Sequence, residues 1–216
     1  MTYTLGDMWM IQTTIQKLSD FLFPRYCYAC HKEGTSLCSN CLKQCKKSID
    51  TPFPWITSIF SFRDPTIKRA IHAIKYFHRK DLVSPFAQIL AHTIMAEAPS
   101  DAILIPIPMP PLRRYMRGDN HAEVLAQEIA QQTNLLTRNN VLVRTKSRKR
   151  QVATHSRHER LKNQHGAFSS RNTEEVQGRH VILIDDVTTT GATLKEARDV
   201  LLKAGAKSVE AYTIAH

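Results

Sequence analysis

The chain has 216 residues, which is enough for one main domain and a smaller second one. Lys and Arg number 30 against 19 Asp and Glu, and the net charge of +11 favours a polyanionic partner. The most apolar stretch, 102–109, contains two prolines and is far shorter than the ~20 residues of a membrane helix, so we expect no membrane partner. With no signal-like run at its start, we expect a cytoplasmic protein.

The first fifty residues differ in pattern from the rest of the chain. Apolar residues of 9–22 fall at helical spacing, and the predicted helix ends before Pro24. A cysteine-rich segment follows at 27–45, and the Thr-Pro-Phe-Pro stretch at 51–54 is a linker. We therefore expect two domains, 1–50 and 51–216.

Four cysteines of the first domain form two knuckles, Cys27-x2-Cys30 and Cys38-x2-Cys41, separated by seven residues. Four thiolates at this spacing suit a closed tetrahedral Zn²⁺ site with a structural role. The alternative is four unrelated buried or disulfide-bonded cysteines, and a reducing cytoplasm disfavours disulfides. We interpret Cys45 as a plain thiol outside this set.

The second domain alternates strand and helix patterns. The expected strands are 56–62, 101–107, 140–145, 181–184 and 208–214. The expected helices are 66–80, 82–97, 120–132 with Asn120 as N-cap, and 194–204 stopped by Gly205. Such alternation predicts parallel β-α-β units and an α/β sheet flanked by helices.

Two adjacent acids, Asp185 and Asp186, end the apolar run 181–184, and a threonine-rich loop with Gly191 follows them. In open parallel sheets, ligands bind beyond the carboxyl ends of the strands. The loop hydroxyls, its N–H groups and the helix that begins near Thr193 suit a phosphate. Because carboxylates repel phosphate, the acids face either ribose hydroxyls or a Mg²⁺ that bridges to them. The alternative is an ordinary strand-turn-helix with a Thr N-cap.

This stretch resembles the phosphoribosyl-pyrophosphate (PRPP) signature of the type I phosphoribosyltransferases. The resemblance implies a type I phosphoribosyltransferase-like sheet, PRPP with Mg²⁺ as ligand, and ribose hydroxyls held by Asp185 and Asp186. It implies that the loop surrounds the 5-phosphate through Thr188, Thr189, Thr190, Gly191, Ala192 and Thr193. Thr189 stands where purine-using members carry an acidic base.

Basic residues follow the strand at 101–107, which we expect to end at the same edge of the sheet as the acids. Arg113, Arg114 and Arg117 could meet the pyrophosphate of PRPP, whose negative charge needs cations when it leaves. Lys75 is a further candidate for this edge. For each of these residues the alternative is a solvated surface position.

A second basic segment runs from 138 to 171, with ten Lys and Arg and one acid. It could be a lid over the pyrophosphate, a track for a nucleic-acid backbone, or a solubilising loop. Aromatic residues are missing from most of it, which favours phosphate contact over base stacking. The candidate nucleic-acid residues are Arg144, Lys146, Arg148, Lys149, Arg150, Arg157 and Arg160.

Four features together resemble the ComF family. They are the four-cysteine element, Arg-Gly-x-Asn at 117–120, Ser-x-x-Glu-Arg-x-x-Asn at 156–163, and the acid-threonine signature. The resemblance implies a role in natural competence, with single-stranded DNA handled in the cytoplasm. It also implies competence helicase or recombination-mediator proteins as partners.

Two hypotheses on activity remain open at this point. In the first, the chain is a PRPP-dependent transferase: Asp185 and Asp186 hold the ribose, and the pyrophosphate leaves towards Arg117. In the second, the chain is a non-catalytic module that senses PRPP and binds DNA and partner proteins. The cradle favours the first hypothesis, whereas the lack of an evident general base near Thr189 favours the second.

Overall fold

The computed structural model describes residues 25–110, 118–145 and 166–216. The chain divides into two compact units, Met1–Gln44 and Cys45–His216. The helix expected at 9–22 lies outside the described residues. Within the described ranges, no helix has both the length and the apolar character needed to cross a membrane.

The first unit is built around its cysteines. Its described part contains one short helix, α2 (Ser39–Gln44), which begins directly after Cys38. Before it, the chain folds back on itself through an isolated antiparallel bridge between Tyr26 and Glu33. The backbone N–H of Cys27 donates to the carbonyl of Lys32 at 2.8 Å. The polypeptide therefore makes a tight loop that brings separate cysteines together.

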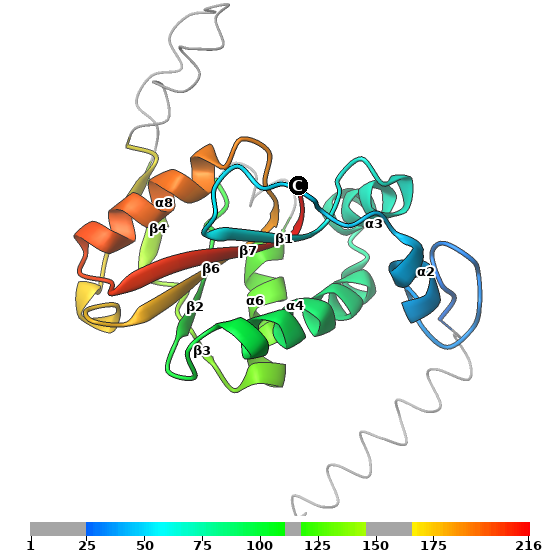
Figure 1. Ribbon diagram of the computed structural model, residues 1–216, viewed down its shortest axis with the longest axis horizontal. Helices are drawn as coiled ribbons and strands as arrows, with labels where there is room; N and C mark the ends of the chain where they lie inside the picture. The colour runs from blue at the N-terminus through cyan, green and yellow to red at the C-terminus, as the bar shows by residue number, and fades with distance from the viewer. Residues whose placement is uncertain (1–24, 111–117, 146–165) are drawn as a thin grey trace, which may run out of the picture. The chain divides into compact units, whose positions relative to one another are not determined.

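The second unit contains a five-stranded parallel sheet in the order β1-β7-β6-β2-β3 (Figure 1). Its strands are β1 (Ile56–Phe60), β2 (Ile103–Pro106), β3 (Leu136–Thr137), β6 (His180–Val187) and β7 (Ser208–Ala215). The expected α/β class is confirmed. Because the strands are parallel, their carboxyl ends meet at one edge of the sheet, where ligands bind in this class of fold.

Helices cover both faces of this sheet. They are α3 (Pro65–Tyr76), α4 (Val83–Glu97), α6 (His121–Thr133) and α8 (Ala192–Lys203), with short 3-10 turns η1 (Lys80–Leu82) and η2 (Thr173–Glu175). Figure 1 shows α8 and α4 on opposite sides of β6 and β7. Asn120 caps α6 as expected, since its side chain accepts from the N–H of Ala122. Gly205, at a φ of 99°, follows the end of α8, also as expected.

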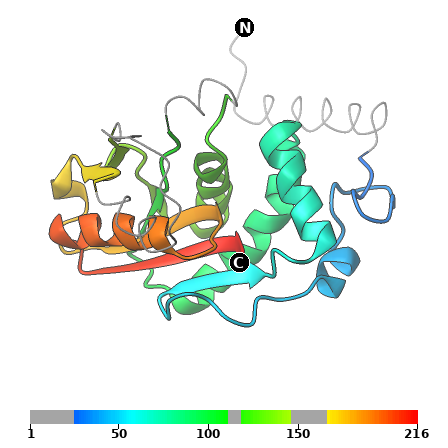
Figure 2. The same cartoon turned by 90° about the horizontal axis from the view of Figure 1, so that it is seen from above.

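Two strands pair outside the main sheet. The segment expected as a strand at 140–145 forms β4 (Leu142–Arg144), which pairs antiparallel with β5 (Phe168–Ser170). Figure 2 shows this ribbon beside α8, and the carboxylate of Glu196 on α8 accepts from the N–H of Ala167 at 2.6 Å. β5 was missed in the sequence because only Phe168 of its three residues is apolar and buried.

The core alternates along each strand, as strand geometry requires. On the α8 face, β6 contributes Val181 and Leu183, which join a buried cluster with Leu194 of α8 and Phe168 of β5. The intervening residue Ile182 is also buried, so both faces of β6 are covered. The same alternation continues through Asp185 and Asp186 near the end of the strand, so their side chains point to opposite faces of the sheet.

The helix expected at 66–80 is shorter than its apolar pattern suggested. Its inward residues up to Ile74 are buried, but α3 ends at Tyr76, and Phe77 is 63% exposed. His78 adopts a positive φ of 53°, which an α-helix cannot continue through. Phe77 is therefore a surface residue instead of the last core position of the helix.

Candidate functional site

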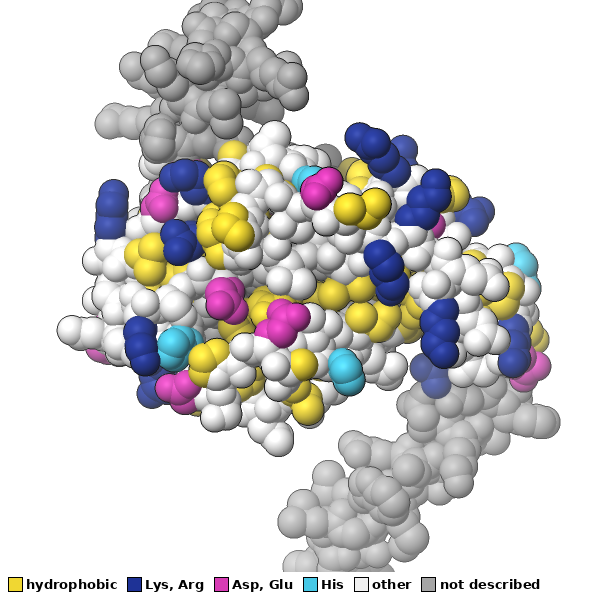
Figure 3. Space-filling model, viewed as in Figure 1, with side chains coloured by type: hydrophobic (Ala, Val, Ile, Leu, Met, Phe, Trp, Pro, Cys, Tyr) yellow, Lys and Arg dark blue, Asp and Glu magenta, His cyan; other side chains and the backbone are white. Residues whose placement is uncertain are grey.

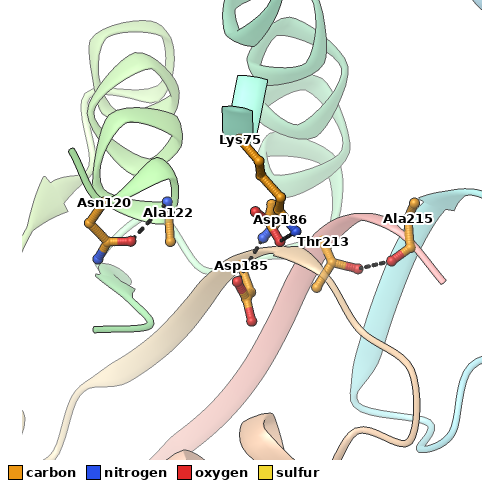
Figure 4. A network of polar contacts seen from close by, with 7 residues as sticks. All are labelled: Lys75, Asn120, Ala122, Asp185, Asp186, Thr213 and Ala215. Atoms are coloured by element: carbon orange, nitrogen blue, oxygen red, sulfur yellow. Dashed lines mark hydrogen bonds and ion pairs between the residues drawn. The ribbon is translucent and has the colours of Figure 1, made fainter. Parts of the chain in front are cut away.

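The two acids near the carboxyl end of β6 point to different surroundings. Asp186 forms an ion pair with Lys75, with 2.8 Å between its Oδ1 atom and the Nζ atom (Figure 4). Asp185 points away from this pair, and its Oδ1 atom accepts from the backbone N–H of Asp186 at 2.8 Å. The acid pair therefore offers carboxylate oxygens on both sides of the strand end.

Burial and charge make Asp185 an unusual carboxyl group. Burial raises the pKa of Asp185 to about 7, and the negative charge of Asp186 acts in the same direction. The N–H of Asp186 and the positive charges of Lys75 and Arg144 only partly oppose this rise. Asp185 therefore titrates near neutral pH, which is typical of carboxylates at functional sites.

The threonine-rich loop that follows the acids is fixed from both sides. The N–H of Thr188 donates to the carbonyl of Ala215 at 3.0 Å, so Thr188 continues the sheet. The carbonyl of Thr189 lies 2.8 Å from the Nε2 atom of His216. The loop ends at the N-terminus of α8, where helix N–H groups favour a negative charge.

The loop has no room for a side chain at Gly191. This glycine caps α8 at a φ of 71°, in the left-handed region that glycine tolerates best. A Cβ atom added here would lie 2.9 Å from ring carbons of Phe53 and from Pro52, which is closer than such atoms approach. The linker before β1 therefore packs directly onto the loop and helps to set its shape.

A cavity of about 360 Å³ opens beside the acid pair, at the carboxyl ends of β2 and β6. The N-terminus of α6 and the segment that leaves β2 form one wall. Its lining residues are Lys75, Ile107, Pro108, Met109, Pro110, Asn120, His121, Ala122, Arg144, Asp185, Asp186, Val187 and Thr193. Both acids and the start of α8 thus share one cavity, whose geometry suits a sugar phosphate.

Three residues that line this cavity have contacts or positions that sequence reasoning missed. Asn120 not only caps α6 but also donates from Nδ2 to the carbonyl of Ile107 at 3.0 Å, which holds the β2 exit in place. His121, the first residue of α6, is buried and lines the cavity. Arg144 lies at the cavity with its guanidinium 5.0 Å from the ring centre of Phe168.

Several predicted residues lie outside the described part of the chain. Arg117 and the neighbouring Arg113 and Arg114 belong to the segment 111–117. The other nucleic-acid candidates belong to the segment 146–165: Lys146, Arg148, Lys149, Arg150, Arg157 and Arg160. Their roles remain predictions. Lys75, a candidate for the same edge of the sheet, does line the cavity.

The four cysteines of the two knuckles come together in the first unit. The sulfur atoms of Cys27, Cys30, Cys38 and Cys41 all lie within 4.8 Å of one another, and all four thiols are free. The Cys30 and Cys38 sulfurs are 3.7 Å apart. A tetrahedral zinc site with Zn–S bonds of about 2.3 Å has sulfur-sulfur edges of about 3.8 Å. The cluster is therefore positioned to bind a metal ion and has the dimensions of a zinc site.

Backbone groups support this cluster. The N–H of Cys38 donates to the sulfur of Cys27 at 3.3 Å. Burial acts to raise the pKa of Cys27, but the N–H groups of Cys38, Cys30 and Ala29 lower it to about 6. A thiolate is the form that binds a metal ion, so the backbone favours the ligating state of Cys27, whereas hydrogen bonds with Cys30 and Cys38 raise the pKa of Cys41.

One family model matches the part of the chain that carries the acids and the threonine-rich loop. The phosphoribosyl transferase domain family matches residues 119–216. Among solved structures, glutamine PRPP amidotransferase from B. subtilis aligns with a TM-score of 0.42 and 19% identity, over 65% of this chain and 30% of that enzyme. The parallel sheet, the site at its edge and the family match define a protein with a phosphoribosyltransferase-type domain.

Relatives that match most of the chain identify its family more specifically. Competence protein F of Haemophilus influenzae is 30% identical over 208 residues, covering 89% of this chain and 85% of that protein. DNA utilization protein YhgH of Salmonella typhimurium is 24% identical over 223 residues, covering 97% and 96%. Competence protein ComFC of Bacillus subtilis is 29% identical over 159 residues, covering 73% and 62%. The chain therefore belongs to the competence protein F (ComF) family.

Proposed function

We propose that the second unit binds PRPP with Mg²⁺ in the cavity beside the acid pair. One observation carries this proposal: two carboxylates, Asp185 and Asp186, line one cavity together with Thr193 in the first turn of α8. Carboxylates suit sugar hydroxyls, and a helix N-terminus with loop N–H groups suits a phosphate. A ribose 5-phosphate derivative satisfies both requirements at once.

Each group at the site has a distinct role in this proposal. Asp185 and Asp186 accept hydrogen bonds from the two ribose hydroxyls. The loop from Thr188 to Thr193 surrounds the 5-phosphate and donates hydroxyl and N–H groups to it, except for the N–H of Thr188, which bonds to Ala215. Lys75 lies across the cavity wall, where its ammonium group can turn from Asp186 to the pyrophosphate. Magnesium would neutralise the pyrophosphate, and Arg117 would contact it during its departure.

The names of the relatives support a role in the handling of incoming DNA. Proteins of the family are called competence proteins and DNA utilization proteins. We propose that this chain acts in natural competence in the cytoplasm, where it handles single-stranded DNA with a competence helicase or recombination-mediator protein. The net charge of +11 supports a polyanionic partner of this kind.

A second candidate function is a non-catalytic module that senses PRPP while it binds DNA and partners. Thr189 carries no acidic base, and its carbonyl is already occupied by His216. Among the described residues of the cavity wall, His121 is the one histidine and therefore a possible base. The two functions differ in whether bound PRPP loses pyrophosphate.

The experiment is a calorimetric titration of PRPP with Mg²⁺ into the wild type, Asp186→Asn and Asp199→Asn. Asp199 lies on the exposed face of α8, so its variant repeats the chemical change away from the cavity. Loss of one charged hydrogen-bond acceptor costs about 1.5–3 kcal/mol, a loss of affinity of about tenfold or more. Asp199→Asn should bind like the wild type. Equal affinity in all three proteins would exclude the proposed site.

Pyrophosphate release on the same samples separates the two candidate functions. Release that single-stranded DNA stimulates would identify a PRPP-dependent transferase that acts in DNA processing. Tight binding without release would identify the sensing module. In either case the Asp186→Asn variant reports whether the signal originates at the cavity.

A further inference from the structure

A second hollow, of about 870 Å³, lies in the second unit where β1, β7 and β6 end side by side. The residues that follow these strands form its walls: Ser61–Arg63 after β1, His216 after β7, and Thr188 with Thr189 after β6. The segment 46–50 closes the remaining side. It thus lies at the same carboxyl edge of the sheet as the first cavity, where ligands of this fold class bind.

Backbone hydrogen bonds fix the walls of this hollow. The N–H of Ser61 donates to the carbonyl of Lys46 at 2.8 Å, and the N–H of Phe62 donates to the carbonyl of His216 at 2.7 Å. The N–H of Lys46 donates to a carboxylate oxygen of Asp64 at 3.0 Å. These bonds extend the sheet beyond its last strand residues, so the hollow is preformed.

Positive charge dominates the rim. Lys46, Lys47 and Arg63 are exposed, and Asp50 is the one acid in the lining. Within the described ranges, no carboxylate lies within ion-pair distance of these three cations. Figure 3 shows further Lys and Arg side chains gathered over the neighbouring helix α3. Cations without acidic partners at a preformed hollow favour an anionic ligand.

The hollow also has an apolar side. Ile49 is 94% exposed, which is unusual for a large apolar residue, and Phe62 is half-buried in the wall. The ammonium group of Lys47 lies 4.2 Å from the ring centre of Phe60, within cation–π distance. An inorganic anion would use the cations and leave this apolar surface exposed to water.

We propose that this hollow is a nucleotide site separate from the PRPP cradle. The phosphate ester would lie among Lys46, Lys47 and Arg63, and the base would lie against Ile49 and Phe62. The ligand is a nucleoside phosphate, which is either a free nucleotide or one nucleotide unit of single-stranded DNA. Thr188 and Thr189 belong to both the loop and this hollow, so the two sites adjoin, whereas Lys46, Lys47 and Arg63 line the hollow and not the first cavity.

Two double variants test the charge requirement. Lys46→Gln with Arg63→Gln removes two cations of the rim, and Lys203→Gln with Lys207→Gln removes two exposed cations outside the hollow. The probes are thymidine 5′-monophosphate and a labelled oligothymidylate of about 15 nucleotides. We expect only the rim variant to weaken binding, by about tenfold, and to lower the salt slope of oligonucleotide binding by about 1.4.

A further pair tests the apolar surface. Ile49→Ser should weaken nucleotide binding but leave the binding of inorganic phosphate unchanged, whereas Leu136→Ser, at another exposed apolar residue, should change neither. Because both residues are exposed, neither change should lower the melting temperature. Equal effects of Ile49→Ser on the nucleotide and on phosphate would contradict an apolar contact with the base.

The outcomes distinguish the ligand source and the two sites. Weakening with both probes identifies a free-nucleotide site, and weakening with the oligonucleotide alone identifies a strand-binding site. Equal losses in the two double variants would mean general electrostatic attraction and overturn the proposal. Loss of PRPP affinity in the rim variant would also overturn it, because the hollow would then belong to the cradle. If the wild type does not bind PRPP, the proposed PRPP site fails, but the nucleotide measurements still test the hollow because their probes do not include PRPP.

Discussion

Replacing Asp185 with Asn should stabilise the protein, and the gain should grow with pH. In the folded protein, burial and the charge of Asp186 raise the pKa of Asp185 from 3.8 to about 7. Between these values the folded carboxyl group keeps a proton that the unfolded chain has lost, so wild-type stability falls as pH rises. Above the folded pKa the loss is complete. The Asn side chain has the same shape but does not titrate, so the variant avoids this loss.

The magnitude follows from the shift of the pKa. Each unit corresponds to about 1.4 kcal/mol, so the full effect approaches about 4 kcal/mol well above pH 7. Between about pH 5 and about pH 8 the advantage of the variant should increase by about 2–3 kcal/mol. This range is an upper limit, because Asp185 borders a cavity that solvent enters.

Urea unfolding at several pH values measures the effect. Trp55, whose ring stacks on Phe53 at 5.2 Å, reports on the second unit when Trp9 is replaced by Phe. Asp199→Asn, an exposed change on α8, should show no such pH trend. A difference between Asp185→Asn and the wild type that stays constant with pH would refute this reasoning. The stabilised variant should also bind PRPP more weakly, as expected where a site is kept for function.

Three further predictions concern the metal cluster, the loop and Lys75. Strong chelation should release one zinc ion per chain and expose the amides of 25–44 to hydrogen exchange; unchanged exchange in the metal-free protein would contradict a structural site. Gly191→Ala should cost about 1–2 kcal/mol from its left-handed backbone alone, and more from overlap with Phe53, with lower melting temperature and PRPP affinity; wild-type values would refute the close approach. Lys75→Met should raise the pKa of Asp185 further and move the pH profile of PRPP binding upward; an unshifted profile would remove Lys75 from the site.

The sequence predicted those features that depend on neighbours along the chain. Alternating strand and helix patterns gave the sheet, and the knuckle spacing gave the cysteine cluster. The acids at the end of β6 follow from one short motif. In each case the prediction rests on a hydrophobic period or on a fixed spacing of residues. Such patterns appear in the sequence because strand ends and metal sites require particular residues at particular positions.

Features that depend on distant segments could not be predicted in this way. Lys75 was a candidate for this edge of the sheet, but its ion pair with Asp186 was not predicted, nor was the hydrogen bond by which Asn120 holds the β2 exit at Ile107. Arg144 lines the cavity from β4, which pairs with β5 instead of joining the main sheet. The boundary expected at residue 50 differs from the division after Gln44, because residues 46–48 hydrogen-bond to the end of β1.

The acid pair is easier to explain by a ligand than by stability. Two adjacent carboxylates at a buried strand end repel each other, and among the described residues the ion pair of Lys75 is with Asp186. Asp185 therefore holds a proton at a pH where an ordinary Asp is charged. A ligand that brings hydroxyl donors to both acids would replace the proton on one and the ammonium contact on the other. The hydrogen-bond donors that the two carboxylates would need are thus those that a ribose with adjacent hydroxyls can supply.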